Sequence, residues 1–224
     1  MRLSPGLSRR QRVALEYWIT RMPGAFQSRL PPLKLAAARQ LNLVRKSVFI
    51  NEDPSSLDNR SREHTHAASF VPERYIVLDA RLFRRRLELG RILYHELCHF
   101  VWPRLGNPKR RHYEALIQQE FQKGVRGELG YSSELRKTGL LARKNVSVPR
   151  SAAGRERSFA RRKRFAESRG SSMRYREWLD YVCESFCDSG SFILLGGERR
   201  RRHSEYNLSQ AARKRRLRLW NQIV

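Results

Sequence analysis

This sequence has few acidic residues for its length. Its 224 residues include 21 Asp and Glu against 47 Lys and Arg, a formal net charge of +26. Such an imbalance is typical of proteins that associate with polyanions such as nucleic acid, the ribosome or an anionic membrane surface. No nucleic-acid motif with base-reading aromatic residues occurs, and general solubilisation explains the same charge. The composition therefore predicts a polyanion partner, with solubilisation as the alternative.

Cysteines and long apolar runs are also scarce. Three cysteines, an odd number, do not form a disulfide framework and fit a reducing cytoplasm. No apolar run approaches the roughly 20 residues of a membrane span, and the longest candidate is only 191–195. A secretory apolar segment is missing near the N-terminus, although the first fifteen residues are basic and free of acids. We expect no membrane span and a cytoplasmic location, with an organelle presequence as the alternative.

The length and the 40% apolar content predict a single domain over 1–224 with a modest core. Residues 143–170 hold ten basic and two acidic residues, and 199–218 hold nine and one. These runs predict a basic insertion at about 140–170 and a basic C-terminal helix from about 205.

Hydrophobic periodicity predicts a mostly helical α+β fold with a small sheet. Expected helices cover 9–20, 33–44, 109–123, 177–188 and 209–222, and expected strands cover 47–50 and 75–78. Residues 54–69 are polar and predict a loop, and 124–133 are glycine-rich and predict turns.

The most informative stretch is His95-Glu96-Leu97-Cys98-His99. On a helix, positions i and i+4 lie one above the other, so His95 and His99 can bind one tetrahedral zinc ion. Zinc that keeps an open position lowers the pKa of a bound water to about 7. Glu96 lies beside the pair and is the candidate general base for that water.

The flanking residues supply the helix that this motif requires. Residues 75–78 predict a buried strand, Asp79 follows as a helix N-cap, and Pro103 ends the helix. Gly90 within the helix predicts close packing against a neighbour, and Cys98 points away from the histidines and is expected in the core. The alternative is a helix whose two histidines only satisfy neighbouring groups.

The strand, the helix and the motif resemble those of the zincin metallopeptidases. The resemblance implies a zincin-like domain with one zinc ion per chain, a sheet next to the motif helix and a peptide or protein substrate. It also implies that the strand at 75–78 lies along the cleft and pairs with extended substrate backbone. Peptide deformylases share the motif but take an upstream cysteine ligand, and no cysteine precedes His95 here.

Two residues compete for the third ligand position. Glu184 and Asp188 are again i and i+4, on an expected helix rich in aromatic residues. This pattern is similar to that of the gluzincins, typified by thermolysin, which implies Glu184 as ligand and Asp188 as the carboxylate that orients His95. His112, thirteen positions after His99, resembles the third histidine of SprT-like metallopeptidases. Those proteins place a glycine after that histidine, where this sequence has Tyr113.

Amide hydrolysis also requires a donor to the developing oxyanion, and Tyr181, His203 and Tyr206 are the candidates. Cys183 and Cys187, also i and i+4, could bind a second metal but fit core thiols better. The sequence thus predicts a zinc-dependent peptidase of gluzincin type with Glu96 as general base. The alternatives are an SprT-like DNA-associated protease with His112 as ligand, and a non-catalytic nucleic-acid-associated protein with a structural metal site.

Overall fold

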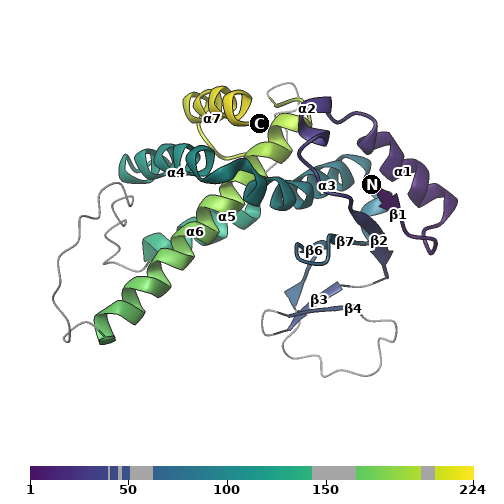
Figure 1. Ribbon diagram of the computed structural model, residues 1–224, viewed down its shortest axis with the longest axis horizontal. Helices are drawn as coiled ribbons and strands as arrows, with labels where there is room; N and C mark the ends of the chain where they lie inside the picture. The colour runs from purple at the N-terminus through teal and green to yellow at the C-terminus, as the bar shows by residue number, and fades with distance from the viewer. Residues whose placement is uncertain (40, 45–46, 51–62, 143–164, 198–204) are drawn as a thin grey trace. The chain divides into compact units, whose positions relative to one another are not determined.

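The computed structural model describes residues 1–224 except 40, 45–46, 51–62, 143–164 and 198–204 (Figure 1). Helices dominate the described residues and accompany a small mixed sheet, which confirms the α+β class. The chain divides into two compact units, the first formed by 1–104, 190–199 and 224, and the second by 105–189 and 200–223. Helix α6 contributes residues to both units. The single domain expected over 1–224 stays a prediction. Most of the expected basic insertion lies outside the described residues.

A four-stranded sheet forms the centre of the first unit. Its order is β1 (Arg2–Leu3), β2 (Lys34–Ala38), β7 (Tyr75–Asp79) and β6 (Ala67–Phe70). The first three strands are parallel and β6 is antiparallel to β7. A second, antiparallel sheet has the order β4 (Ser47–Ile50), β3 (Leu41–Val44) and β5 (Glu63–His64). The strands expected at 47–50 and 75–78 are therefore confirmed.

Two expectations for this unit are wrong. Where a helix was expected over 33–44, the chain forms β2 and β3, although Leu, Ala and Lys favour helices. The reason is tertiary: β2 lies between two parallel neighbours, where Leu35, Ala36 and Ala38 are buried. The region expected as a loop at 54–69 contains β5 and β6, while 51–62 lie outside the described residues.

The strand before the motif helix does not occupy the position that the zincin resemblance implied. β7 is paired with β2 along one edge and with β6 along the other, so its backbone cannot receive an additional strand. β6 is the last strand of this sheet in the part of the chain that the structure describes. In the described part of the chain, the edge strands of this sheet are β1 and β6, and β6 packs against the motif helix.

The motif helix is α3 (Arg86–Val101), which follows the short 3-10 helix η2 (Ala80–Arg84). Asp79 caps η2, because its carboxylate accepts from the backbone N–H of Arg81 at 2.7 Å. The expected close packing at Gly90 is confirmed, since a Cβ there would lie 2.5 to 2.8 Å from ring atoms of Trp18. Only glycine lets α3 approach that ring so closely.

Trp18 belongs to α1 (Arg9–Ile19), which begins with a capping box formed by Ser8 and Gln11. Its indole N–H donates to the carbonyl of Arg86 at 3.1 Å, and the hydroxyl of Tyr94 donates to the carbonyl of Trp18 at 2.9 Å. These hydrogen bonds fix α1 against the motif helix at both ends of the contact. A short helix, α2 (Gly24–Gln27), follows.

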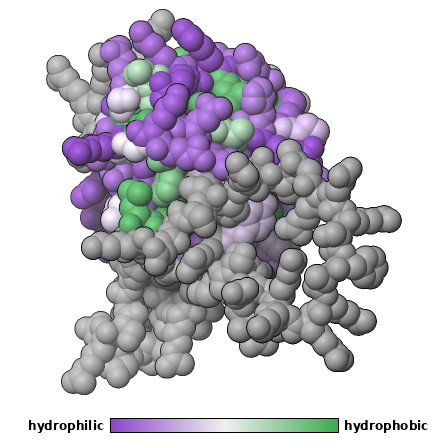
Figure 2. All heavy atoms as spheres, turned by 90° about the vertical axis from the view of Figure 1, so that its left-hand side faces the viewer, coloured by the Kyte–Doolittle hydropathy of each residue, from purple (hydrophilic) through white to green (hydrophobic). Residues whose placement is uncertain are grey.

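The second unit is helical in its described residues. After the 3-10 helix η3 (Trp102–Leu105) it contains α4 (Gly106–Gln122), α5 (Tyr131–Ala142), most of α6 (Phe165–Leu194) and α7 (Gln210–Ile223). The C-terminal helix is confirmed, α5 was not predicted, and α6 is longer at both ends than the helix expected at 177–188. The face drawn in Figure 2 is largely hydrophilic where the chain is described. Within the described residues, no helix combines the length and apolar character needed to cross a membrane.

Candidate metal centre

His95 and His99 lie one turn apart on α3, as the motif predicts. Their Nε2 atoms are 3.3 Å apart and their rings meet at 73°. Two nitrogens bound to one tetrahedral zinc at 2.0 to 2.1 Å are about 3.4 Å apart. The pair therefore has the separation that a shared zinc ion requires. His95 is 7% exposed and His99 is half-buried, so the pair retains some contact with water.

Glu96, between the two histidines in sequence, is only 9% exposed. Its Oε2 accepts a 2.5 Å hydrogen bond from the hydroxyl of Ser69, which also lies 3.2 Å from the Glu96 carbonyl. Ser69 belongs to β6, so the sheet holds the carboxylate of the motif helix. Sequence reasoning missed Ser69 because 54–69 looked like a loop; its one signal was a hydroxyl within the apolar segment Ala67–Phe70.

Glu184 and Asp188 lie one turn apart on α6, in the second unit, as the sequence predicted. The Glu184 side chain is 13% exposed, and its Oε1 accepts from Nη2 of Arg136 on α5 at 3.2 Å. Arg136 also lies 3.8 Å from the carboxylate of Asp180. The carboxylate of Glu184 therefore already pairs with a cation, Arg136. A metal ion would have to share this carboxylate with the arginine or displace the arginine from it.

Asp188 is 2% exposed and accepts the backbone N–H of Ser133 at 3.0 Å. Gly130 lies directly against its carboxylate, because a Cβ at that position would overlap the carboxylate atoms. The loop before α5 therefore fixes the rotamer of Asp188.

Candidate ligands are present in both units. They are His95 and His99 in the first, and Cys183, Glu184 and Cys187 in the second. Imidazole, thiolate and carboxylate are the ligand types that zinc prefers. The histidine pair lies on one helix of the first unit. That Glu184 binds the same metal ion as this pair is a proposal.

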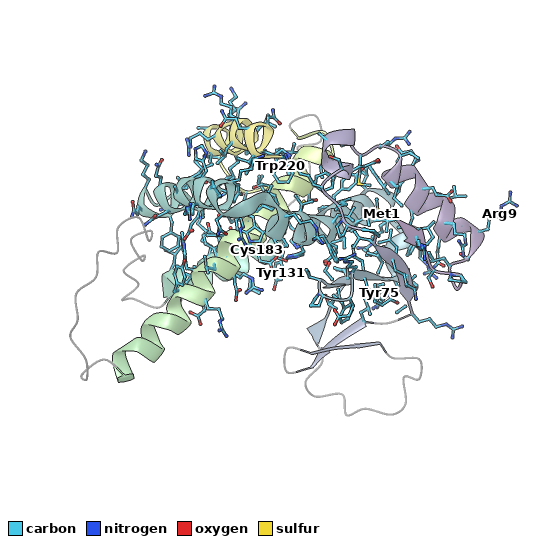
Figure 3. The ribbon with its side chains drawn as sticks, in the orientation of Figure 1. Met1, Arg9, Tyr75, Tyr131, Cys183 and Trp220 are labelled. Carbon is cyan, nitrogen blue, oxygen red and sulfur yellow. The ribbon has the colours of Figure 1, made fainter. Side chains whose placement is uncertain are left out.

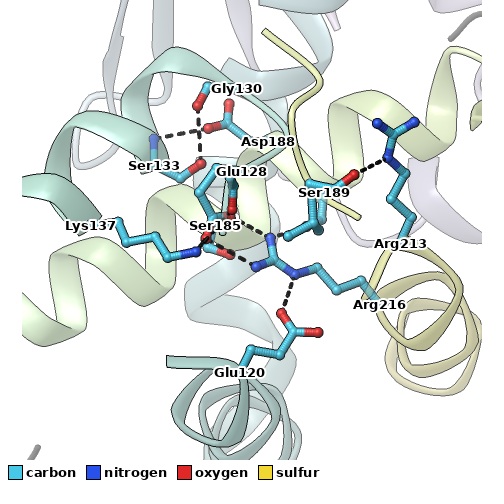
Figure 4. Close-up of polar contacts among 12 residues, drawn as sticks. Glu120, Glu128, Gly130, Ser133, Lys137, Ser185, Asp188, Ser189, Arg213 and Arg216 are labelled. Atoms are coloured by element: carbon cyan, nitrogen blue, oxygen red, sulfur yellow. Dashed lines mark hydrogen bonds and ion pairs between the residues drawn. The ribbon is translucent and has the colours of Figure 1, made fainter. Parts of the chain in front are cut away.

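A buried charge network surrounds α6 in the second unit (Figure 4). Arg216 of α7 is fully buried and donates to Glu120 at 2.9 Å and to Glu128 at 2.6 and 3.1 Å. Glu128 also accepts from Lys137 at 3.1 Å and from the hydroxyl of Tyr181 at 2.5 Å. Two cations face two carboxylates here, so the buried charges balance.

Hydroxyl groups of α6 extend this network. Tyr113 of α4 donates to the carbonyl of Ser185 at 2.9 Å, and its hydroxyl lies 3.0 Å from that of Ser189. Ser189 also lies 3.4 Å from Nη1 of Arg216. The stretch of α6 that carries Glu184 and Asp188 is thus anchored by polar contacts with α4 and α7.

The network shifts the pKa values of its members. Burial alone would raise the pKa of Glu128, but Arg216, with help from Lys137 and Tyr181, lowers it to about 2. Burial and the Glu128 charge raise the pKa of Tyr181, and burial raises that of Tyr113. Glu128 is therefore a carboxylate and both tyrosines are neutral at physiological pH.

The other predicted residues lie as follows. His112 is exposed on α4, and Tyr206 is buried, with its carbonyl accepting from Arg213 at 2.6 Å. Tyr181 is fully buried with its hydroxyl on Glu128, so this hydroxyl is engaged within the second unit. His203 lies outside the described residues.

All three cysteines are free thiols. Cys98 is buried, as expected, and so is Cys187, whereas Cys183 is half-buried on α6 (Figure 3).

Comparison of the chain with protein-family models, with curated proteins and with solved structures found no match.

Proposed function

We propose that the protein is a zinc-dependent peptidase. The observation that carries the proposal is the histidine pair of α3, whose Nε2 atoms are 3.3 Å apart. The buried carboxylate of Glu96 belongs to the same helix turn, held by Ser69. A structural metal site has no need of a carboxylate fixed in this way, whereas hydrolysis requires a base beside the reacting water.

Glu184 is the proposed third ligand. In the first unit, the hydroxyl of Ser191 at the end of α6 donates to the carbonyl of Arg91 on α3 at 2.7 Å, and both residues are buried. Glu184 lies seven residues before Ser191, on the same side of α6, and His99 lies eight residues after Arg91 on α3. These separations are about 11 and about 12 Å along a helix. The proposal therefore requires α3 and α6 to be antiparallel, so that Glu184 and His99 lie on the same side of this contact.

The chemistry then divides among the residues. When bound, zinc supplies a Lewis acid that polarises a peptide carbonyl and acidifies a water. His95, His99 and Glu184 would hold it, and Asp188 would orient the imidazole of His95. Glu96 takes the proton of the attacking water and later returns it to the leaving amine. Ser69 keeps the carboxylate of Glu96 directed at that water. His203 and Tyr206 remain the predicted donors to the oxyanion.

Extended substrate backbone would pair with the outer edge of β6, the strand that carries Ser69. Main-chain hydrogen bonds of this kind give affinity with little dependence on side chains. The three free cysteines fit a reducing compartment, the cytoplasm being the simplest.

Two alternative functions differ from this proposal, one in the third metal ligand and the other in the absence of catalysis. An SprT-like protease would use His112, whose exposure leaves it free to reorient. A non-catalytic protein would bind the metal without turning over peptides.

Replacement of Glu96 by Gln separates enzyme from metal-binding protein. Hydrolysis of quenched fluorescent peptides of mixed sequence should fall at least about a hundredfold, because a general base contributes that much or more. Zinc content should stay unchanged, and Glu73→Gln, which alters an exposed carboxylate, should retain activity. Absence of hydrolysis by the zinc-loaded wild type would refute the peptidase, as would full activity of Glu96→Gln.

A further inference from the structure

Four exposed arginines gather where α1 ends and α3 begins. They are Arg21, Arg84, Arg85 and Arg86. Among the described residues, no carboxylate forms an ion pair with any of the four, and the nearby acids Asp79 and Glu88 pair with Arg81 and Arg91 instead. We call these four residues the arginine cluster. It lies within the first unit and does not involve the histidine pair.

Two members of the cluster are stacked on one aromatic ring. The guanidinium carbons of Arg21 and Arg86 lie 3.5 and 3.6 Å from the ring centroid of Tyr17. Two guanidinium groups cannot both lie so near the centroid on one face without overlapping, so they occupy opposite faces. Arg21 is further fixed by a 3.1 Å hydrogen bond to the Tyr17 carbonyl, and the backbone of Arg86 by the indole N–H of Trp18.

This arrangement holds two like charges on either side of one ring. The ring attracts each cation, but the two cations repel one another, and Arg84 and Arg85 add further positive charge. The positive end of the α3 dipole adds to the same field. An anion at the guanidinium edges would relieve this repulsion. The stacked planes also fix the direction of the N–H donors before any ligand arrives.

We propose that the arginine cluster binds single-stranded nucleic acid. Guanidinium edges donate in pairs to phosphodiester oxygens, and the outer guanidinium faces can stack with unpaired bases. Alternating charge contacts and stacking platforms are the general means by which proteins hold single strands. An anionic lipid surface needs positive charge alone, so it gives no reason for the flat stack on Tyr17.

The test measures binding of a labelled oligothymidylate of about 20 nucleotides by fluorescence anisotropy at several salt concentrations. Arg21→Ala/Arg86→Ala should weaken binding at least about tenfold and reduce the slope of log Kd against log salt by about 1.4, for two lost phosphate contacts. The matched control is Arg9→Ala/Arg10→Ala, which removes the same charge at the other end of α1, where Arg9 extends away from the ribbon (Figure 3). The control should bind much more tightly than the test variant.

Two further variants separate the stack from its charge. Tyr17→Leu and Arg21→Lys/Arg86→Lys preserve the net charge but remove the ring or the flat guanidinium groups, and both should weaken binding. The lysine variant is mild enough to keep the proposal testable where the others do not fold. Equal losses in the control and test variants would overturn it. So would undiminished binding by the lysine variant, or binding to phosphatidylserine vesicles but not to the oligonucleotide.

Discussion

The hydroxyl of Ser69 donates a 2.5 Å hydrogen bond to the carboxylate of Glu96, and so connects strand β6 to the motif helix. Both residues belong to the first unit. The bond selects one orientation of a side chain that would otherwise have several rotamers. In the proposed mechanism Ser69 is a positioning residue, because it acts only through Glu96.

Replacement of Ser69 by Ala should lower kcat by about tenfold to a hundredfold, the worth of a hydrogen bond to a charged group. KM and zinc content should change little, because the metal ligands and the substrate backbone contacts remain. Steady-state kinetics on a fluorogenic peptide, with zinc measured on the same samples, gives all three values. Ser69→Thr keeps the hydroxyl and should retain most of the activity. If the alanine variant lost its zinc instead, Ser69 would have a structural role.

Acid should destabilise the protein through Glu128. The folded state holds the pKa of this carboxyl at about 2, below its ordinary value of 4.5, so it binds fewer protons than the unfolded chain. The resulting stability, about 3 kcal/mol, is present above pH 4.5 and is lost as the pH falls toward 2. Urea unfolding of the wild type and of Glu128→Gln should show a difference at neutral pH that shrinks through this range. A difference that grew in acid would contradict the assignment.

Arg216 supplies the matched control for Glu128. The Glu128→Gln variant leaves the Arg216 charge buried without its main partner, which typically costs about 3 to 5 kcal/mol. Adding Arg216→Met removes that charge and should restore part of the lost free energy of unfolding. The comparison also needs Arg216→Met alone. If the double variant lost as much free energy of unfolding as the two single variants lose together, or more, the residues would not act as a pair.

Two glycines inside helices should respond oppositely to alanine. At Gly90 a Cβ would meet the Trp18 ring, whereas at Gly139 on α5 nothing lies within 4 Å. Gly90→Ala should therefore destabilise the protein by about 1 to 3 kcal/mol, through overpacking. Gly139→Ala should stabilise it by up to about 1 kcal/mol, since alanine favours helices. Thermal unfolding measures both, and a stabilised Gly90→Ala variant would show that α1 does not pack on α3 as described.

Arg136 should oppose metal binding, because its guanidinium shares the carboxylate of Glu184. In Arg136→Ala, zinc affinity should rise by up to about fivefold, since an exposed ion pair is worth up to about 1 kcal/mol. Competition with a chromogenic chelator measures the affinity. Lys123→Ala removes an exposed cation of the same unit and should have little effect. Weaker zinc binding by the Arg136 variant would mean that the arginine supports the ligand instead.

The elements that were predicted correctly are those with a strong local signal. The helices α1, α3 and α7 and the strands β4 and β7 follow from apolar periodicity and, for the end of α3, from Pro103, whereas Asp79, predicted to cap this helix, caps η2 instead. The strand β2 was missed because its Leu, Ala and Lys residues favour a helix, and only its parallel neighbours make it a strand. The contact of β6 with α3 was missed because Ser69 and Glu96 are 27 residues apart in sequence, and contacts between such distant residues leave no local pattern.

The candidate site divides in a similar way. His95, Glu96 and His99 were found because their spacing places them together on any helix. Ser69 depends on how the sheet meets α3, which no spacing reveals. Arg216 lies in the run 199–218, which predicted only a basic helix, yet it is fully buried, because Glu120 and Glu128 reach it from distant parts of the sequence.

The most direct measurement for the proposed zinc centre is zinc per chain by elemental analysis, after purification without chelators. It compares the wild type with Glu184→Ala and His112→Ala, and with Asp180→Ala as an exposed control on the same helix. We predict one zinc per chain in the wild type, the His112 variant and the control, and loss of zinc in the Glu184 variant. Full zinc in Glu184→Ala, or none in the wild type, would contradict the account.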